Sequence, residues 1–203
     1  MNKDIQNLLA RASKIGEDLE NLVVQRGSFL VQSDRTLLIV GYWALVFDYH
    51  KSILTLLEKQ FYGGAFALLR PMLEAVLRAH ITLACKPSVL KSLRNDKYTV
   101  NFKEVGPYLD KTYGFGGLFE KIMKTQGPLH SFTHSGTSQL SRRFDGNDVR
   151  PTFPDAEIIE VIGSTTSMTF MVTALATKHL GFEQEWKAVN EIYRSNISGK
   201  LRK

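Results

Sequence analysis

The sequence predicts an all-α protein, a single helical domain over residues 1–203 folded as an up-and-down bundle. Apolar residues recur with the period of a helix along nearly the whole chain, and no segment alternates as a half-buried strand does. The chain has 203 residues, of which 43% are hydrophobic and 23% charged. That size and composition are typical of one globular domain with one sizeable core.

The first two helices are predicted over residues 4–24 and 33–59. The first carries an apolar stripe made of Ile5, Leu8, Leu9, Ala12, Ile15, Leu19, Leu22 and Val23. Ser33 is placed to cap the second helix, because its side chain can accept a hydrogen bond from a backbone N–H of the first turn. The uncharged run 36–47 is apolar on most sides, so we expect the second helix to be central to the core.

Gly63 and Gly64 mark a break, after which residues 65–85 are predicted to form a third helix. Pro71 interrupts this helix, and a kink is expected there because proline removes one backbone hydrogen bond. Cys85 is the only cysteine of the sequence and closes an apolar run. We therefore expect a buried thiol, no intrachain disulfide and a reducing compartment.

The chain then leaves the bundle in an irregular excursion over about 87–127, with short helices at 88–94 and 102–111. The remaining helices are predicted over residues 128–143, 155–180 and 182–197, with a loop at 145–154. Pro128 suits the first turn of a helix, and residues 152–155 resemble a capping box. Gly181 ends the helix before it. The basic end, about 198–203, is expected to be frayed.

Charge and hydropathy indicate the compartment and the class of partner. The formal net charge is +6 and the isoelectric point about 9.4, which permits an acidic partner such as RNA. The N-terminal residues become charged and amphipathic at once and do not form a signal peptide. The longest uncharged run, 161–177, is shorter than a membrane span and contains seven Ser or Thr residues. We expect a cytoplasmic protein without a membrane partner.

Two histidines, His130 and His134, would lie one turn apart on the helix predicted over 128–143. Three interpretations stay open for this pair: structural hydrogen bonding, proton transfer near neutral pH, and metal binding. The strong zinc signature has a glutamate between the histidines and a third ligand elsewhere. Because that glutamate is missing, we assign no metal to the site. We assign no organic cofactor to it either.

A second motif places charged residues on an otherwise apolar helix. Arg70, Glu74 and Arg78 follow the spacing i, i+4, i+8 and form one narrow stripe. The rest of that helix is apolar, so we expect part of the stripe to be shielded from water and to need partners. The alternative is a solvated ladder of salt bridges of little energetic value.

The helix predicted over 155–180 is unusually rich in small hydroxyl residues, namely Ser164, Thr165, Thr166, Ser167, Thr169, Thr173 and Thr177. Close packing between helices explains this density, and a helix–helix contact between subunits is the more specific interpretation. The chain also has more apolar helical surface than a four-helix core needs. We therefore expect a homodimer.

The motifs at 67–75 and 130–136 resemble those of an uncharacterised bacterial family of all-helical proteins. That family is in turn similar to HEPN-type helical bundles, which are dimeric proteins of toxin–antitoxin, abortive-infection and antiphage systems. Many of them are metal-independent ribonucleases. The resemblance therefore implies a HEPN-like bundle with RNA as the substrate, and a cognate antitoxin or another defence-system protein as a partner.

The resemblance also implies roles for residues. In HEPN ribonucleases an arginine stabilises the phosphate charge while a histidine moves the proton of the ribose 2′-hydroxyl. The candidate catalytic residues here are Arg70, Glu74, His130 and His134, and the candidate phosphate or RNA contacts are Arg78, Arg142 and Arg143. HEPN ribonucleases carry the arginine shortly before the histidine on one helix, a relation that no arginine of this chain has. The site would therefore combine two helices.

Two functions follow as hypotheses. The first is a metal-independent endoribonuclease that acts as a toxin or antiphage-defence effector. The second is a non-catalytic interaction module, such as a sensor, an antitoxin or a scaffold, in which the same arginine, glutamate and histidine residues form a structural cluster. The fold by itself does not confer either activity.

Overall fold

The structure, a computed structural model, describes residues 1–26, 33–113, 117, 119–120, 131–134 and 136–196. In this part of the chain nearly all regular structure is helical, and the two strands of the single hairpin have two residues each. The prediction of an all-α helical bundle is confirmed.

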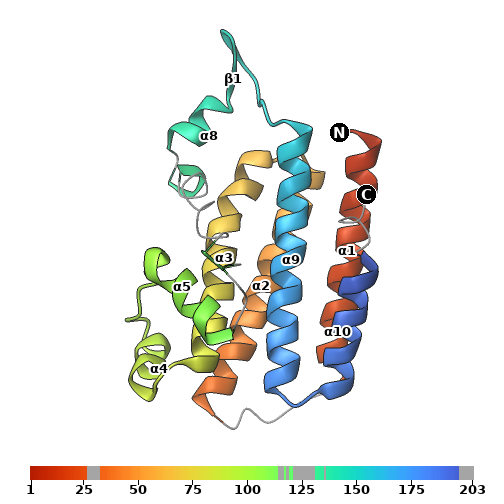
Figure 1. Ribbon diagram of the computed structural model, residues 1–203. Coiled ribbons are helices and arrows are strands. Elements are labelled where there is room, and N and C mark those ends of the chain that lie inside the picture. The colour runs from red at the N-terminus through yellow and green to blue at the C-terminus, as the bar shows by residue number, and fades with distance from the viewer. Residues whose placement is uncertain (27–32, 114–116, 118, 121–130, 135, 197–203) are drawn as a thin grey trace.

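The elements in chain order are α1 (Lys3–Val24), α2 (Asp34–Glu58), α3 (Tyr62–Ala84), α4 (Pro87–Arg94), α5 (Phe102–Tyr113), α8 (Thr137–Ser141), β1 (Phe144–Asp145), β2 (Asp148–Val149), α9 (Asp155–His179) and α10 (Glu183–Asn196). Helices α1, α2, α3 and α9 run side by side, and α10 lies along α1 and α9 (Figure 1). Helices α4 and α5 lie beside α3, and the hairpin projects from one end of the bundle (Figure 1).

The start of α2 is where the capping chemistry of the sequence predicted it. The side chain of Ser33 accepts a hydrogen bond from the backbone N–H of Thr36 at 3.1 Å. This bond satisfies one of the donors that every helix leaves unpaired at its first turn.

Ser33→Ala is expected to lower the free energy of unfolding by about 1 kcal/mol, because the capped N–H loses its acceptor. Urea denaturation followed by circular dichroism measures the change. Ser52→Ala is the matched control, since Ser52 is exposed within the same helix and caps nothing. Its effect should stay within about 0.5 kcal/mol. Equal losses for the two variants would contradict the capping role.

Helix α3 begins earlier than predicted, because the break lies at Gln60 and Phe61. Gln60 adopts a left-handed backbone conformation with φ of 62°, which ends α2 sharply. The carbonyl of Phe61 then accepts hydrogen bonds from Gly64 and Ala65, so both glycines fall inside the helix. The prediction that Gly63 and Gly64 form the break is wrong. The helix continues through Pro71 to Ala84.

One continuous helix over residues 128–143 was expected, and this prediction is wrong in the part that the structure describes. Residues 131–133 are helical, His134 lies in a turn, and Gly136 is extended. The N–H of Gly136 donates to the carbonyl of Ser131 at 2.7 Å. A Cβ at position 136 would lie 3.2 Å from the Ser131 backbone, so a glycine allows the chain to turn here before α8.

The loop predicted at 145–154 contains the hairpin, a structure that the sequence did not suggest. Phe144 pairs with Val149 and Asp145 with Asp148. Gly146 occupies the connecting turn with φ of 60°, a conformation that favours glycine. Strands of two residues are too short to show an alternating pattern, which is why the periodicity did not reveal them.

The capping box predicted at 152–155 is also wrong. The N–H of Thr152 donates to the carbonyl of Arg142 at 2.8 Å, and its hydroxyl to the carbonyl of Phe144 at 3.4 Å. The N–H and the hydroxyl of Thr152 are therefore both bonded to the residues that lead into the hairpin. The N-cap residue of α9 is Pro154, which has no side-chain capping bond.

The two short helices of the excursion, α4 and α5, and the last helix agree with their predictions within a few residues, and most of residues 114–127 lies outside the described residues. Helix α4 and helix α5 both pack on α3. Gly181, with φ of 72°, separates α9 from α10 as expected. Cys85 is buried, which confirms the interpretation of an enclosed thiol.

The hydroxyl-rich helix α9 contacts α1, α2, α3 and α10 of its own chain. Its buried threonines are Thr165, Thr166, Thr169, Thr173 and Thr177. The last four donate hydroxyl hydrogen bonds to backbone carbonyls one turn earlier, so their buried hydroxyl groups have hydrogen-bond partners within α9. For these threonines the structure shows packing within one chain instead of a subunit contact.

Two helices of the described residues, α2 and α9, are long and apolar enough to cross a membrane by length and composition alone. Core helices of soluble proteins pass the same test. Most of α9 is buried inside the bundle, as its position among four other helices requires.

Candidate functional site

Arg70 lies near the middle of α3, half-buried, with its guanidinium stacked on an aromatic ring. Its Cζ is 4.6 Å from the centre of the Phe102 ring at the start of α5. A cation over the face of a ring is attracted by the electron density of that face. Within the described part of the chain no carboxylate lies within ion-pair distance of Arg70. Its charge is therefore held in place without being neutralised.

Glu74 and Arg78 bind each other across one helical turn of α3. The Nη2 and Nε atoms of Arg78 lie 2.8 Å and 3.1 Å from Oε1 of Glu74. Arg78 also interacts with the side chain of Tyr42 of α2. Its Nη1 atom lies 3.9 Å from Oδ1 of Asp96, which follows α4. Burial lowers the pKa of Arg78, but Glu74 and Tyr42 outweigh it, so the pKa is raised. This pair ties α3 to α2 and to the excursion.

The segment that carries His134 docks on the first half of α3. The rings of Phe132 and Phe66 lie 5.0 Å apart, and both side chains are buried. The hydroxyl of Thr133 donates to the carbonyl of Ala67 at 3.2 Å. Arg70 follows Phe66 by one turn on the same side of α3. The structure therefore brings the segment of His134 beside the helix of Arg70.

If the two motifs form one site, Glu74 or one of its neighbours is expected to contact one of the two histidines, and this stays a prediction. Arg78 is the partner of Glu74 among the described residues, and His134 is exposed. His130 lies outside the described residues. The two histidines were expected to stack on one long helix, but His134 instead lies at the turn that ends residues 131–133.

The two neighbouring arginines after α8 differ in their surroundings. Arg142 forms an ion pair with Glu157 of α9. Arg143 lies against Gly63 at the start of α3, where a Cβ would come within 2.7 Å of Nη2 of Arg143. No carboxylate among the described residues pairs with Arg143. Of the three candidate phosphate contacts, Arg78 and Arg142 are thus ion-paired, and Arg143 has no ion pair within the described part of the chain.

Two buried histidines were not singled out from the sequence. The Nε2 atom of His50 lies 3.3 Å from the carbonyl of Ala12, and its Nδ1 lies 3.2 Å from the hydroxyl of Thr165. A carbonyl can only accept, so Nε2 carries the proton and Nδ1 lies unprotonated beside the hydroxyl of Thr165. His50 thus joins α1, α2 and α9. Loss of hydration lowers its pKa to about 4, and the charge of Lys51 adds to this effect.

His80 is the second buried histidine. Its Nδ1 donates to the carbonyl of Val76 at 2.9 Å, and its ring meets Phe119 edge-on with centres 5.2 Å apart. Burial lowers its pKa to about 4. Both histidines occupy buried-face positions of their helices, so the helical period was the signal that could have found them.

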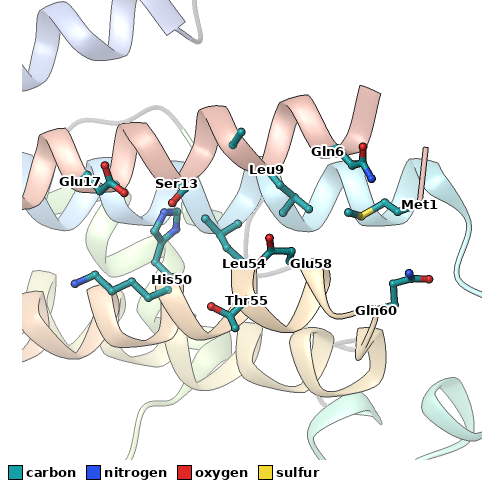
Figure 2. A pocket seen from close by; sticks show the side chains of 13 residues that line it. Met1, Gln6, Leu9, Ser13, Glu17, His50, Leu54, Thr55, Glu58 and Gln60 are labelled. Atoms are coloured by element: carbon teal, nitrogen blue, oxygen red, sulfur yellow. The ribbon is translucent and has the colours of Figure 1, made fainter. Parts of the chain in front are cut away.

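A groove of about 610 Å³ separates α1 from α2. Figure 2 shows the ring of His50 directed across this groove toward α1, near Ser13. Glu17 and Glu58 line its sides, and Leu9 and Leu54 contribute apolar surface. Of the residues predicted for the site, none that the structure describes lines this groove, so it is separate from the site on α3.

The arrangement on α3 offers a positive charge, Arg70, next to a segment with a histidine that is open to solvent. A guanidinium can bind an anion and an imidazole can move a proton, and these two side chains come from neighbouring segments. Among the described residues no group of three or more His, Cys, Asp or Glu side chains is arranged to hold a metal ion. No protein-family model, no curated protein and no solved structure matches the chain.

Proposed function

We propose that this protein is a HEPN-like bundle that cleaves RNA without a metal ion, in the cytoplasm, as a toxin or antiphage-defence effector. The observation that carries the proposal is the docking of residues 131–134 on the turn of α3 that precedes Arg70, at Phe66 and Ala67. Arg70 has no carboxylate partner among the described residues, so its charge is available to a phosphate.

In the proposed reaction His134 takes the proton of a ribose 2′-hydroxyl, and the 2′-oxygen attacks the adjacent phosphorus. The bond from phosphorus to the 5′-oxygen breaks, so the products are a 2′,3′-cyclic phosphate and a free 5′-hydroxyl. We assign the proton of that hydroxyl to His130. Arg70 stabilises the negative charge that grows on the phosphoryl oxygens. Glu74 acts indirectly, because its bond to Arg78 braces α3.

An RNA-cleavage assay tests the proposal. The wild-type protein is expected to cleave an end-labelled single-stranded RNA in the presence of EDTA. Arg70→Ala and His134→Ala should each slow cleavage by about 100-fold, since each removes charge stabilisation or proton transfer from the transition state. Mass spectrometry of the products should find 2′,3′-cyclic phosphate ends.

Arg26→Ala is the matched control for loss of one positive charge. Arg26 follows the end of α1 and forms an ion pair with Glu185 of α10. Its cleavage rate should stay within about threefold of wild type. Intact RNA with the wild-type protein under all conditions would contradict the proposal. Equal losses in Arg26→Ala and Arg70→Ala would contradict the role of Arg70.

A second candidate function is the non-catalytic interaction module, a sensor, antitoxin or scaffold. The bonds of Arg78 to Glu74 and Tyr42 favour it, because they use the charged stripe to hold the fold. In that case Arg70→Ala and His134→Ala change the melting temperature alone, and any cellular phenotype follows stability.

The partners belong to the same proposal: a homodimer, RNA, and a cognate antitoxin or another defence-system protein. The outward face of α2 supports the homodimer. Leu37 is 47% and Leu45 38% exposed on this face. Gly41 lies between them, and a Cβ at this position would meet no atom within 4 Å. A helix that approached this face would meet a small, uncharged surface.

A further inference from the structure

A cavity of about 450 Å³ lies at the corner between α2 and α3. We call it the corner site; its lining includes Phe61, Tyr62, Gly63, Arg143, Pro151 and Phe153. Its volume falls within the range of about 300–1,000 Å³ that is typical of ligand pockets. It therefore has room for one ligand of the size of a nucleotide.

The charge in the corner site is carried by Arg143. No carboxylate of the described residues pairs with it, whereas the neighbouring Arg142 is bound to Glu157. A Cβ at position 63 would lie 2.7 Å from Nη2, so a side chain there would make the guanidinium shift away from α3. A glycine thus makes room for the guanidinium against α3. An exposed guanidinium without a carboxylate partner is suited to bind a phosphate through two N–H groups.

The corner site also exposes an aromatic ring. Phe61 is 65% exposed, although exposure of so large an apolar side chain is unfavourable. The left-handed conformation of Gln60 makes the sharp corner on which Phe61 stands. Behind it, the rings of Tyr62 and Phe153 pack with centres 5.4 Å apart. An exposed ring beside a cationic side chain is the combination with which proteins bind single-stranded nucleic acids.

We propose that the corner site binds one nucleotide of a single-stranded RNA, with the phosphate at Arg143 and the base stacked on Phe61. The proposal rests on the proposed function for its choice of RNA as the ligand. The corner site would bind the RNA strand at a point away from the catalytic residues. It would also favour single-stranded RNA, because a base within a duplex cannot present its face to Phe61.

Fluorescence anisotropy with a labelled 2′-O-methyl oligonucleotide tests this, because the methylated 2′-oxygen cannot react and binding is measured without cleavage. Arg143→Ala is expected to weaken binding about tenfold or more, since a charged hydrogen-bonding partner of the phosphate is lost. Phe61→Ala should weaken it at least about fivefold through loss of stacking. A duplex of the same sequence should bind more weakly than the single strand.

Arg26→Ala is the matched control, because it removes the same charge from an arginine that is already paired with Glu185 and does not line the corner site. Its effect should stay within about threefold, and circular dichroism should show all three variants folded. Equal weakening by Arg26→Ala and Arg143→Ala would overturn the proposal in favour of an effect of net charge. Absence of binding by the wild-type protein would overturn it as well.

The two proposals can fail separately. If the wild-type protein binds the oligonucleotide through Arg143 and Phe61 but leaves unmodified RNA intact, the corner site stands and the ribonuclease proposal falls. If the protein cleaves RNA while Arg143→Ala and Phe61→Ala leave binding unchanged, the ribonuclease proposal stands and the corner site falls.

Discussion

Acidification from pH 7 to pH 4 is expected to cost this protein a large part of its stability, because His50 and His80 are neutral in the folded core. Both have a folded-state pKa of about 4, against 6.5 for an unperturbed histidine. Between these values the unfolded chain binds more protons than the folded one, so stability falls as the pH falls. Above pH 6.5 the stability is present in full.

The expected loss is about 3 kcal/mol for each histidine, reached as the pH approaches 4. Most domains have a total stability of about 5–15 kcal/mol, so the combined effect brings the protein close to unfolding. Urea denaturation at pH 7.5, 5.5 and 4.5 measures the loss. His80→Gln keeps an N–H donor but does not titrate, so its pH dependence should be about half as steep. A wild-type stability that is flat from pH 7 to 4.5 would refute this account.

Gly16→Ala is expected to destabilise the protein although alanine is the better helix former. A Cβ at position 16 would lie 2.7 Å from Nε2 and 2.8 Å from Cδ2 of His50. The His50 ring is held by Ala12 and Thr165 and cannot move aside cheaply. Overpacking of a core costs about 1–3 kcal/mol, which outweighs the gain of about 1 kcal/mol in helix propensity. We expect a net loss of up to about 2 kcal/mol.

Gly163→Ala is the matched control, since Gly163 is exposed within α9 and an added Cβ there would meet no atom within 4 Å. The same change there should stabilise the protein by about 0.5–1 kcal/mol. Chemical denaturation at pH 7.5 compares the two variants. On a His50→Ala background the loss from Gly16→Ala should disappear, because the colliding ring is gone. An equal gain from both glycine substitutions would show that position 16 is not packed against His50.

The charged stripe on α3 could be identified from the sequence, but the pairing of its side chains could not. The spacing of Arg70, Glu74 and Arg78 identified the stripe, yet sequence spacing does not tell which arginine the glutamate binds. The answer depends on residues from other helices. Tyr42 of α2 interacts with Arg78, which binds Glu74, whereas Phe102 of α5 stacks on Arg70, which has no carboxylate partner among the described residues. Such partners are distant in sequence, so no local pattern contains them.

The difference between Arg142 and Arg143 has the same origin. The two are adjacent and chemically identical, but successive residues point in different directions from the backbone. One side chain meets Glu157 of α9 and the other meets Gly63 of α3. The long-range packing of the hairpin segment thus decides which arginine keeps its charge unneutralised.

The sequence by itself determined the all-α class, the Ser33 cap and the approximate bounds of α1, α2, α4, α5, α9 and α10, because helical period, N-cap side chains and terminating glycines act within a few residues. Tertiary structure decided where the chain turns at Gln60 and Gly136, and that His50 and His80 are buried and neutral. Turns of this kind depend on close approach between backbones, and a pKa depends on hydration and on neighbouring charges in the folded chain. The backbone contacts at these turns and the environment of the two histidines exist only after the helices have packed.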